Sequence, residues 1–130
     1  MNPSPEPLNE SPFKGKSGIR RVINALGYSI QGLKAAYHHE SAFRQEVILS
    51  VLLIPISLFL KTSGVGHALM VGSVLLVLLV ELLNSAVEAA VDRVSLEKHR
   101  LSKRAKDIGS AAVLISLINV AVIWLLILFY

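Results

Sequence analysis

The last segment of the chain, from Ile108 to Tyr130, is almost entirely apolar and long enough to cross a lipid bilayer. A membrane-spanning helix needs about 20 consecutive, predominantly apolar residues. Before Tyr130 the only polar side chains in this segment, apart from Trp124, are Asn119 and two serines. The composition agrees, because 53% of the residues are hydrophobic and 17% are charged, whereas a soluble domain carries about 25% charged residues. These features disfavour a soluble globular protein.

Two further apolar segments precede this one. The run from Val47 to Leu60 is short for a span, but a helix that extends back through Phe43 supplies the missing length. A turn at 61–64 leads into a second long segment that is densely apolar in its middle. We therefore predict an all-α membrane protein whose transmembrane helices lie at about 43–60, 65–91 and 108–130, with a polar connection from Val94 to Asp107.

The region before the first span has the pattern of an amphipathic helix at about 18–39. Its apolar residues share one face at helical spacing, and its basic residues lie mostly elsewhere, which is typical of a helix in the membrane interface. A helix packed on a protein core is the alternative. The preceding residues, 1–17, are polar and rich in proline, so we expect a disordered tail followed by a single membrane-embedded domain at 18–130. The apolar face consists of Ile19, Val22, Ile23, Leu26, Ile30, Leu33 and Tyr37.

The basic residues predict the orientation in the membrane. Lysines and arginines precede the first span and fill the connection between the second and third, whereas Lys61 is the only one between the first and second. By the positive-inside rule, the amino terminus and the 94–107 loop are cytoplasmic and the carboxyl terminus is outside. The net charge of +4 favours membrane surfaces and phosphates over nucleic acid as partners. Because the chain has no cysteine, thiol chemistry and disulfides are excluded.

A row of polar residues interrupts the second apolar segment. Their spacing of three or four residues places them on one face of a helix, which we call the polar stripe. Carboxylates inside a membrane are costly and usually face a partner or a cavity. Hydrogen bonding between packed helices is the simpler explanation of these polar residues. Two glutamates two turns apart, however, are more than such packing requires. The polar stripe consists of Glu81, Asn84, Ser85, Glu88 and Asp92, with Glu81 about 10 Å deeper than Glu88.

Two sites near the cytoplasmic surface complete the candidate chemistry. Glu40 either forms a surface pair with Arg44 one helical turn away or meets Glu88 to make a magnesium site with phosphate oxygens and water. Lys106 and Asp107 directly precede the third span. The Lys106 ammonium is suited to hold transferring phosphates, with Asp107 to orient it.

Three motifs, which follow one another along the chain as in the family, resemble those of the prokaryotic diacylglycerol kinases, a family of small integral-membrane lipid kinases. They are Glu81–Arg93, Glu40–Glu46 and Arg104–Val113, and the resemblance extends from about Gly18 to the end of the chain. Lys98 departs from the aromatic residue of the family pattern at that position. The proline-rich tail is also additional to that pattern.

The resemblance implies a homotrimer in the bacterial inner membrane, with active sites shared between chains. It implies phosphorylation of diacylglycerol to phosphatidic acid, with ATP as cosubstrate and Mg²⁺ as metal. By matching position, Glu81 is the general base, Asn84 supports the reacting groups, and Glu40 and Glu88 hold Mg²⁺. The expected ATP contacts are Arg21, Tyr28, Glu40, Glu88, Glu97, His99, Lys106 and Asp107, and the expected lipid contacts are Arg21, Glu46, Glu81, Ser110 and Trp124. The alternatives are an undecaprenol kinase and a non-enzymatic membrane assembly subunit.

Overall fold

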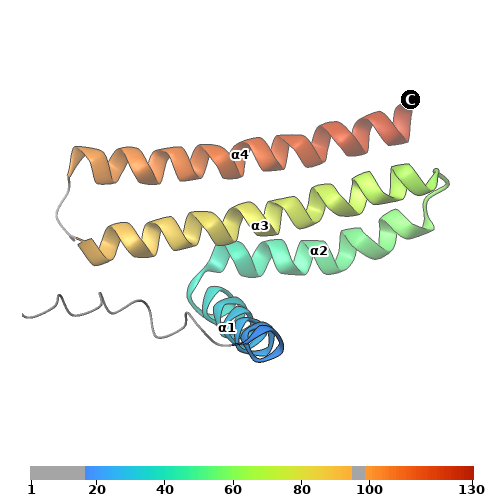
Figure 1. Cartoon of the computed structure of the whole chain (residues 1–130). Helices are drawn as coiled ribbons and strands as arrows, with labels where there is room; N and C mark the ends of the chain where they lie inside the picture. The colour runs from blue at the N-terminus through green and yellow to red at the C-terminus, as the bar shows by residue number, and fades with distance from the viewer. Residues whose placement is uncertain (1–16, 95–98) are drawn as a thin grey trace, which may run out of the picture. The chain divides into compact units, whose positions relative to one another are not determined.

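The computed structural model describes residues 17–94 and 99–130, and within these ranges it contains four α-helices and no strand (Figure 1). The prediction of an all-α fold is therefore confirmed. The chain divides into two units, residues 1–34 and residues 35–130, which are treated separately. The helices are α1 (Gly18–His39), α2 (Ser41–Phe59), α3 (Gly64–Val94) and α4 (Arg100–Phe129).

Helix α1 is amphipathic, as its sequence pattern predicts. The apolar residues of its predicted face are exposed, from 45% for Ile30 to 81% for Ile19. Such a row of exposed apolar side chains on a helix with basic residues suits the boundary between lipid and water. The predicted tail falls almost entirely on residues 1–16, which lie outside the described ranges.

A capping interaction ends α1 and fixes the start of α2. The Arg44 guanidinium donates from Nη1 to the backbone oxygens of Tyr37 and His38, at 2.8 and 2.9 Å. These carbonyls belong to the last turn of α1, where helical partners run out. Glu40 stands between the two helices in an extended conformation, and its side chain makes no capping hydrogen bond. The Arg44 side chain thus hydrogen-bonds to backbone oxygens at the end of α1. The structure does not show the expected surface ion pair between Arg44 and Glu40.

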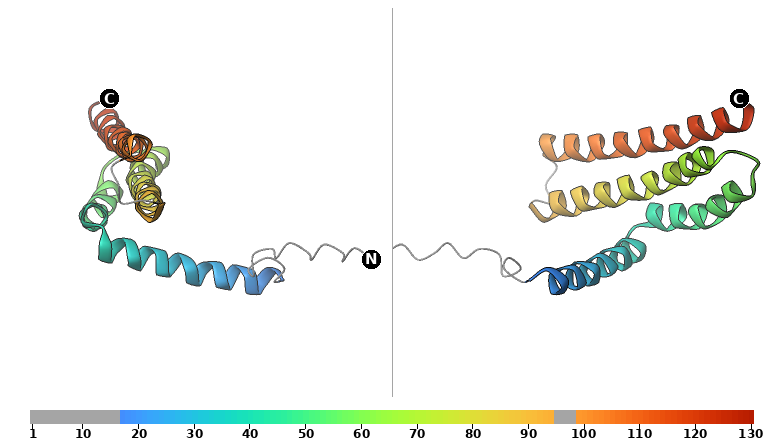
Figure 2. Two further views of the ribbon diagram at one scale, coloured as in Figure 1. Left: turned by 90° about the vertical axis from the view of Figure 1, so that its left-hand side faces the viewer. Right: turned by 45° about the vertical axis from the view of Figure 1, so that its right-hand side comes forward.

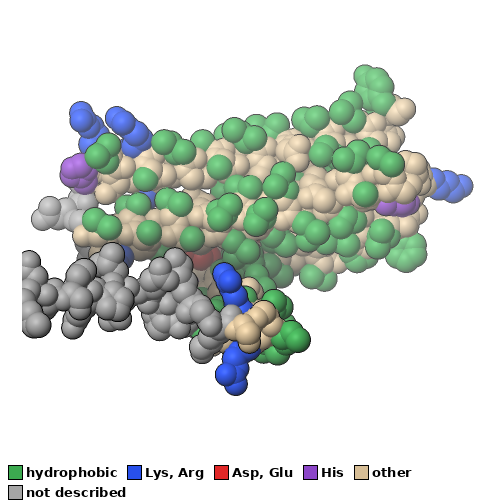
Figure 3. Space-filling view, in the orientation of Figure 1, with side chains coloured by type: hydrophobic (Ala, Val, Ile, Leu, Met, Phe, Trp, Pro, Cys, Tyr) green, Lys and Arg blue, Asp and Glu red, His purple; other side chains and the backbone are tan. Residues whose placement is uncertain are grey.

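Helices α2, α3 and α4 lie side by side and alternate in direction (Figure 2). All three are long and apolar enough to cross a membrane. The contacts of α3 with its two neighbours bury only a small core, which includes Phe43, Met70, Val74 and Val77. Hydrophobic side chains cover the visible outer faces of α3 and α4, and Lys and Arg side chains gather where α4 begins (Figure 3). This distribution is that of helices whose outer faces meet lipid or other membrane helices.

The turn between α2 and α3 is held by polar contacts from both helix ends. His67 Nδ1 lies 2.9 Å from the backbone oxygen of Ser57, and the Gly66 N–H donates to Ser63 Oγ at 3.1 Å. A side chain at Gly66 would overlap Thr62, so the close approach of the turn requires glycine there. The bond to Ser63 satisfies one of the backbone N–H groups that the first turn of a helix leaves unpaired.

One sequence expectation about the fold is wrong. The polar connection was expected to run from Val94 to Asp107, but α4 already begins at Arg100, after His99 caps it by accepting the Leu101 N–H at 3.1 Å. The residues from Arg100 to Asp107 are mostly polar, and most of them are good helix formers. The Lys103–Asp107 ion pair, one turn apart, adds support. Helix α4 therefore includes much of the stretch that was expected to form the polar connection.

Candidate active site

The polar stripe occupies one face of α3, as its spacing predicts. Glu81 is only 5% exposed, and Asn84, Ser85 and Glu88 are half-buried. Glu81 interacts electrostatically with Glu88 and Glu40. The structure therefore brings the carboxylate at the start of α2 near the carboxylates of α3, an arrangement that the sequence alone only suggested.

A fourth carboxylate, that of Glu46, joins this group from the second turn of α2. Glu46 interacts electrostatically with Glu81. Several negative charges in a poorly solvated region repel one another unless protons or a cation neutralise them. The group formed by Glu40, Glu46, Glu81 and Glu88 is thus suited to handle protons or to bind a cation.

Three buried polar atoms of α2 and α3 have no hydrogen-bond partner within residues 17–94 and 99–130. They are Glu46 Oε2, Asn84 Oδ1 and Ser85 Oγ. The Ser85 hydroxyl contrasts with those of Ser50, Ser57, Ser73 and Ser116, which all donate to a carbonyl of their own helix. Buried polar groups are nearly always paired in native proteins. Unpaired atoms of this kind are expected where a polar ligand completes the site.

The arrangement of carboxylates fits magnesium only in combination with a phosphate ligand. In the described parts of the chain, no group of three or more Asp, Glu or His side chains could hold a metal ion by itself. Mg²⁺ is commonly held by one or two carboxylates together with substrate phosphates and water. Glu40 and Glu88, which both interact with Glu81, provide donors of the right kind and number for that mode.

Two ion pairs at the start of α4 differ from the predicted arrangement. Lys106 Nζ lies 2.6 Å from Asp92 Oδ1 at the end of the polar stripe, whereas Asp107 Oδ2 lies 2.6 Å from Lys103 Nζ. The expectation that Asp107 orients Lys106 is therefore wrong for this structure. Successive residues of a helix point about 100° apart, so a neighbour in sequence is poorly placed to hold Lys106.

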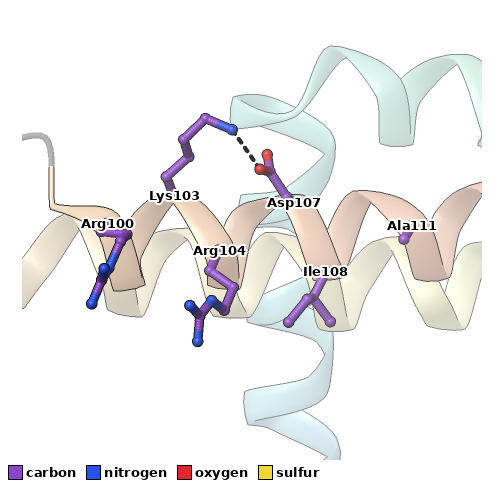
Figure 4. Close-up of a pocket in the computed structure, with 6 residues that line it drawn as sticks. All are labelled: Arg100, Lys103, Arg104, Asp107, Ile108 and Ala111. Carbon is purple, nitrogen blue, oxygen red and sulfur yellow. Dashed lines mark hydrogen bonds and ion pairs between the residues drawn. The ribbon is translucent and has the colours of Figure 1, made fainter.

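The first turns of α4 also form a shallow hollow with basic walls. Figure 4 shows Lys103 paired with Asp107, and Arg100 and Arg104 projecting from the same helix. Sequence reasoning treated this stretch as a solvated loop and missed the hollow. The helical spacing of its residues is the signal that would have found it. It is lined by Arg100, Lys103, Arg104, Asp107, Ile108 and Ala111.

The remaining predicted site residues lie in other parts of the chain. Arg21 and Tyr28 belong to the unit of residues 1–34, and Glu97 lies outside the described residues. His99 caps α4, and Ser110 is exposed. Trp124 donates from Nε1 to Ser73 Oγ at 3.2 Å and so joins α4 to α3. Their roles in binding stay predictions.

Comparison with known proteins identifies the family. The family model described as prokaryotic diacylglycerol kinase matches residues 27–128. A protein of Pseudomonas aeruginosa named diacylglycerol kinase is 55% identical over 117 residues, which cover 90% of this chain and 95% of that protein. Proteins of the same name from Haemophilus influenzae and Escherichia coli K12 are 51% and 48% identical, covering 88% and 86% of this chain and 97% and 92% of their own length. The chain belongs to the prokaryotic diacylglycerol kinase family.

Proposed function

We propose that this protein transfers the γ-phosphoryl group of ATP to the free hydroxyl of diacylglycerol, giving phosphatidic acid and ADP. The observation that carries the proposal is Glu81, a carboxylate only 5% exposed in a membrane helix, on the same helix face as the unpaired polar atoms of Asn84 and Ser85. Such a group is too costly to be kept without a partner or a reaction. The names of the relatives support diacylglycerol as the acceptor.

The chemistry requires a base and charge neutralisation. In the proposed step the Glu81 carboxylate accepts the proton of the lipid hydroxyl, whose oxygen bonds to the γ-phosphorus as the bond from that phosphorus to the bridging oxygen of ADP breaks. Phosphoryl transfer depends mainly on positioning and electrostatic stabilisation. Mg²⁺, when bound through Glu40 and Glu88, supplies neutralisation of phosphate charge. Lys106 adds a positive charge at the same end of α3 and α4.

Different depths in the membrane account for the different proposed roles of Glu81, as base, and of Glu88, as a magnesium ligand. Glu81 is about two helical turns deeper than Glu88, a separation of roughly 10 Å along α3. A lipid hydroxyl is confined to the interface and reaches the deeper carboxylate from the membrane side. The phosphates of ATP arrive from water, where Glu40, Glu88 and Lys106 are nearer. The proposal places this reaction at the cytoplasmic face of the bacterial inner membrane, with the carboxyl terminus outside.

The assembly proposed for the active protein is a homotrimer with shared sites. Within residues 35–94 and 99–130, the helix that carries the polar stripe packs against α2 and α4, and most large apolar side chains on these helices are exposed. One chain therefore gives little enclosure to a site that must exclude water. Helices of neighbouring chains would complete the enclosure of the active site.

The test is transfer of radiolabelled γ-phosphate by purified protein in mixed micelles that contain either diacylglycerol or undecaprenol. We expect labelled phosphatidic acid and little labelled polyprenol phosphate. Preferential labelling of undecaprenol would identify a polyprenol kinase instead. No lipid labelling by folded protein, with either acceptor, would favour a non-enzymatic membrane subunit.

A further inference from the structure

Gly109 of α4 lies directly against the side chain of Asn84 on α3. A Cβ placed on Gly109 would overlap Asn84 Oδ1, and it would lie 3.2 Å from Asn84 Cγ. Asn84 Oδ1 is buried and has no hydrogen-bond partner in the described part of the chain. The α4 backbone therefore occupies the place beside this oxygen, and only a residue without a side chain leaves room for the amide.

The contact restricts the direction of the other end of the Asn84 amide. Asn84 Nδ2 points to Glu88 Oε1 at 3.5 Å, one helical turn further along α3. An asparagine amide has a broad range of orientations about its last torsion. The α4 backbone at Gly109, on one side of the Asn84 amide, therefore restricts its rotation strongly. A side chain at position 109 would rotate the amide and move Nδ2 away from Glu88.

We propose that Gly109 is a positioning residue that holds Asn84 in the orientation in which its amide supports Glu88. This inference rests on the proposed function, in which Glu88 binds magnesium together with phosphate. Gly109 has no side chain with which to bind substrate or metal. It acts by leaving space, in the way that outer groups orient the carboxylates that bind a metal.

The position of Gly109 makes it suited to this role. It follows Lys106 by three residues on α4, and Asn84 precedes Glu88 by four residues on α3. The contact therefore fixes the separation of the two helices close to the place where the cation and the carboxylate are presented. Substitution would change the local geometry without removing any charged group.

The matched control is Gly72, which lies in α3 within the membrane-spanning region. A Cβ on Gly72 meets no atom within 4 Å. Gly109→Ala and Gly72→Ala thus make the same chemical change in two membrane helices, and only the first meets Asn84. A general effect of alanine on membrane helices would appear in both variants.

The experiment measures phosphoryl transfer against Mg²⁺ concentration, and the thermal unfolding midpoint, for Gly109→Ala, Asn84→Ala and the double variant. Loss of an outer partner of a metal ligand typically costs about 10- to 100-fold in metal affinity or activity. We expect Gly109→Ala to raise the Mg²⁺ concentration for half-maximal activity by about tenfold, and Gly72→Ala to leave it unchanged. We also expect the double variant to be no worse than Asn84→Ala alone in either measurement.

The outcomes separate this inference from the proposed function. A normal magnesium curve for Gly109→Ala, while Asn84→Ala is impaired, would overturn the role of Gly109 alone. Full activity of Asn84→Ala would overturn the proposed role of Asn84 and with it that of Gly109, while the kinase assignment would stand. If Gly109→Ala fails to fold, the unfolding midpoint of the double variant decides. A midpoint equal to that of Asn84→Ala supports the contact, and a further loss contradicts it.

Discussion

The ammonium of Lys106 is bound by Asp92, with 2.6 Å between Nζ and Oδ1, so that the first turns of α4 are joined to the last turns of α3. Asp92 is the outermost member of the polar stripe, and the pair is about half exposed, at 42% for the Lys106 side chain and 52% for that of Asp92. The pair holds a positive charge at the end of the stripe where the proposed function requires phosphates.

Asp92→Asn tests whether this ion pair positions Lys106. The substitution keeps the shape of the side chain but removes its charge. We expect the KM for ATP to rise by roughly three- to tenfold, less than for a buried charged hydrogen bond because the pair is partly solvated. We expect kcat to change less than KM. Steady-state kinetics at varied ATP give the answer, and a fall in KM would show that Asp92 competes with phosphates for Lys106.

Lys103→Gln is the control for that experiment. The Lys103–Asp107 pair has the same 2.6 Å separation but is more exposed, at 79% and 63%. Exposed pairs one turn apart contribute little. We expect the KM for ATP to change by less than about twofold. A larger change than in Asp92→Asn would move the important cation from Lys106 to Lys103.

The fold was largely predictable because membrane helices leave a strong signal in sequence. Long apolar runs at 65–91 and 108–130 correspond to α3 and α4, and the run after Phe43 corresponds to α2. The start of α4 was not found, because Arg100 to Asp107 carry charges that hydropathy assigns to a loop. Their helix propensity was the better guide. Hydropathy reports where a helix is buried in lipid and does not report where it ends.

The candidate site was predictable along one helix and not between helices. The face shared by Glu81 and Glu88 follows from the helical period. The contacts of Lys106 with Asp92, and of Trp124 with Ser73 on α3, depend on the rotation of α4 about its own axis. Because α4 is apolar on nearly every side within the membrane, its pattern does not specify that rotation.

Trp124→Phe tests the contact between α3 and α4 in the membrane. The substitution keeps an aromatic ring but removes the hydrogen bond from Nε1 to Ser73 Oγ. Hydrogen bonds between membrane helices are worth about 0.6 kcal/mol on average and at most about 1.7 kcal/mol. We expect a loss in this range in the free energy of unfolding, measured by titration with sodium dodecyl sulfate.

A double-mutant cycle with Ser73→Ala isolates the hydrogen bond of Trp124 from the change in ring size. The losses of Trp124→Phe and Ser73→Ala should add to more than the loss in the double variant. Strict additivity would mean that the two side chains contribute to stability independently.

Glu40→Gln and Glu88→Gln test the proposed magnesium ligands. Each removes one negative charge near Glu81 and replaces a good Mg²⁺ ligand with a neutral amide. We expect both to raise the Mg²⁺ concentration for half-maximal activity by at least about tenfold. Glu46→Gln is the matched control, and its activity should fall without a shift of the magnesium curve. Curves that are scaled but not shifted in all three variants would assign structural roles to Glu40 and Glu88.

Mixing of two inactive variants tests shared active sites. If Glu81 and Lys106 of one site come from different chains, trimers refolded from Glu81→Gln and Lys106→Ala chains contain some intact sites. We expect measurable activity after the two proteins are unfolded, mixed and refolded, or after the same treatment of another pairing among Glu40, Glu81, Glu88 and Lys106 variants. A pull-down with a tag on one chain controls for mixing. No recovery in any mixed pairing would remove support for sharing and leave the kinase assignment intact.

The central claim is that Glu81 is the base that activates the lipid hydroxyl. The most direct measurement is the rate of radiolabelled γ-phosphate transfer to diacylglycerol by wild-type protein and by Glu81→Gln, each shown to be folded and assembled. Loss of a general base typically lowers a rate by roughly 10²–10⁴-fold, and we expect a loss of this size in kcat with an assembled oligomer. Near-normal turnover by Glu81→Gln would contradict the claim.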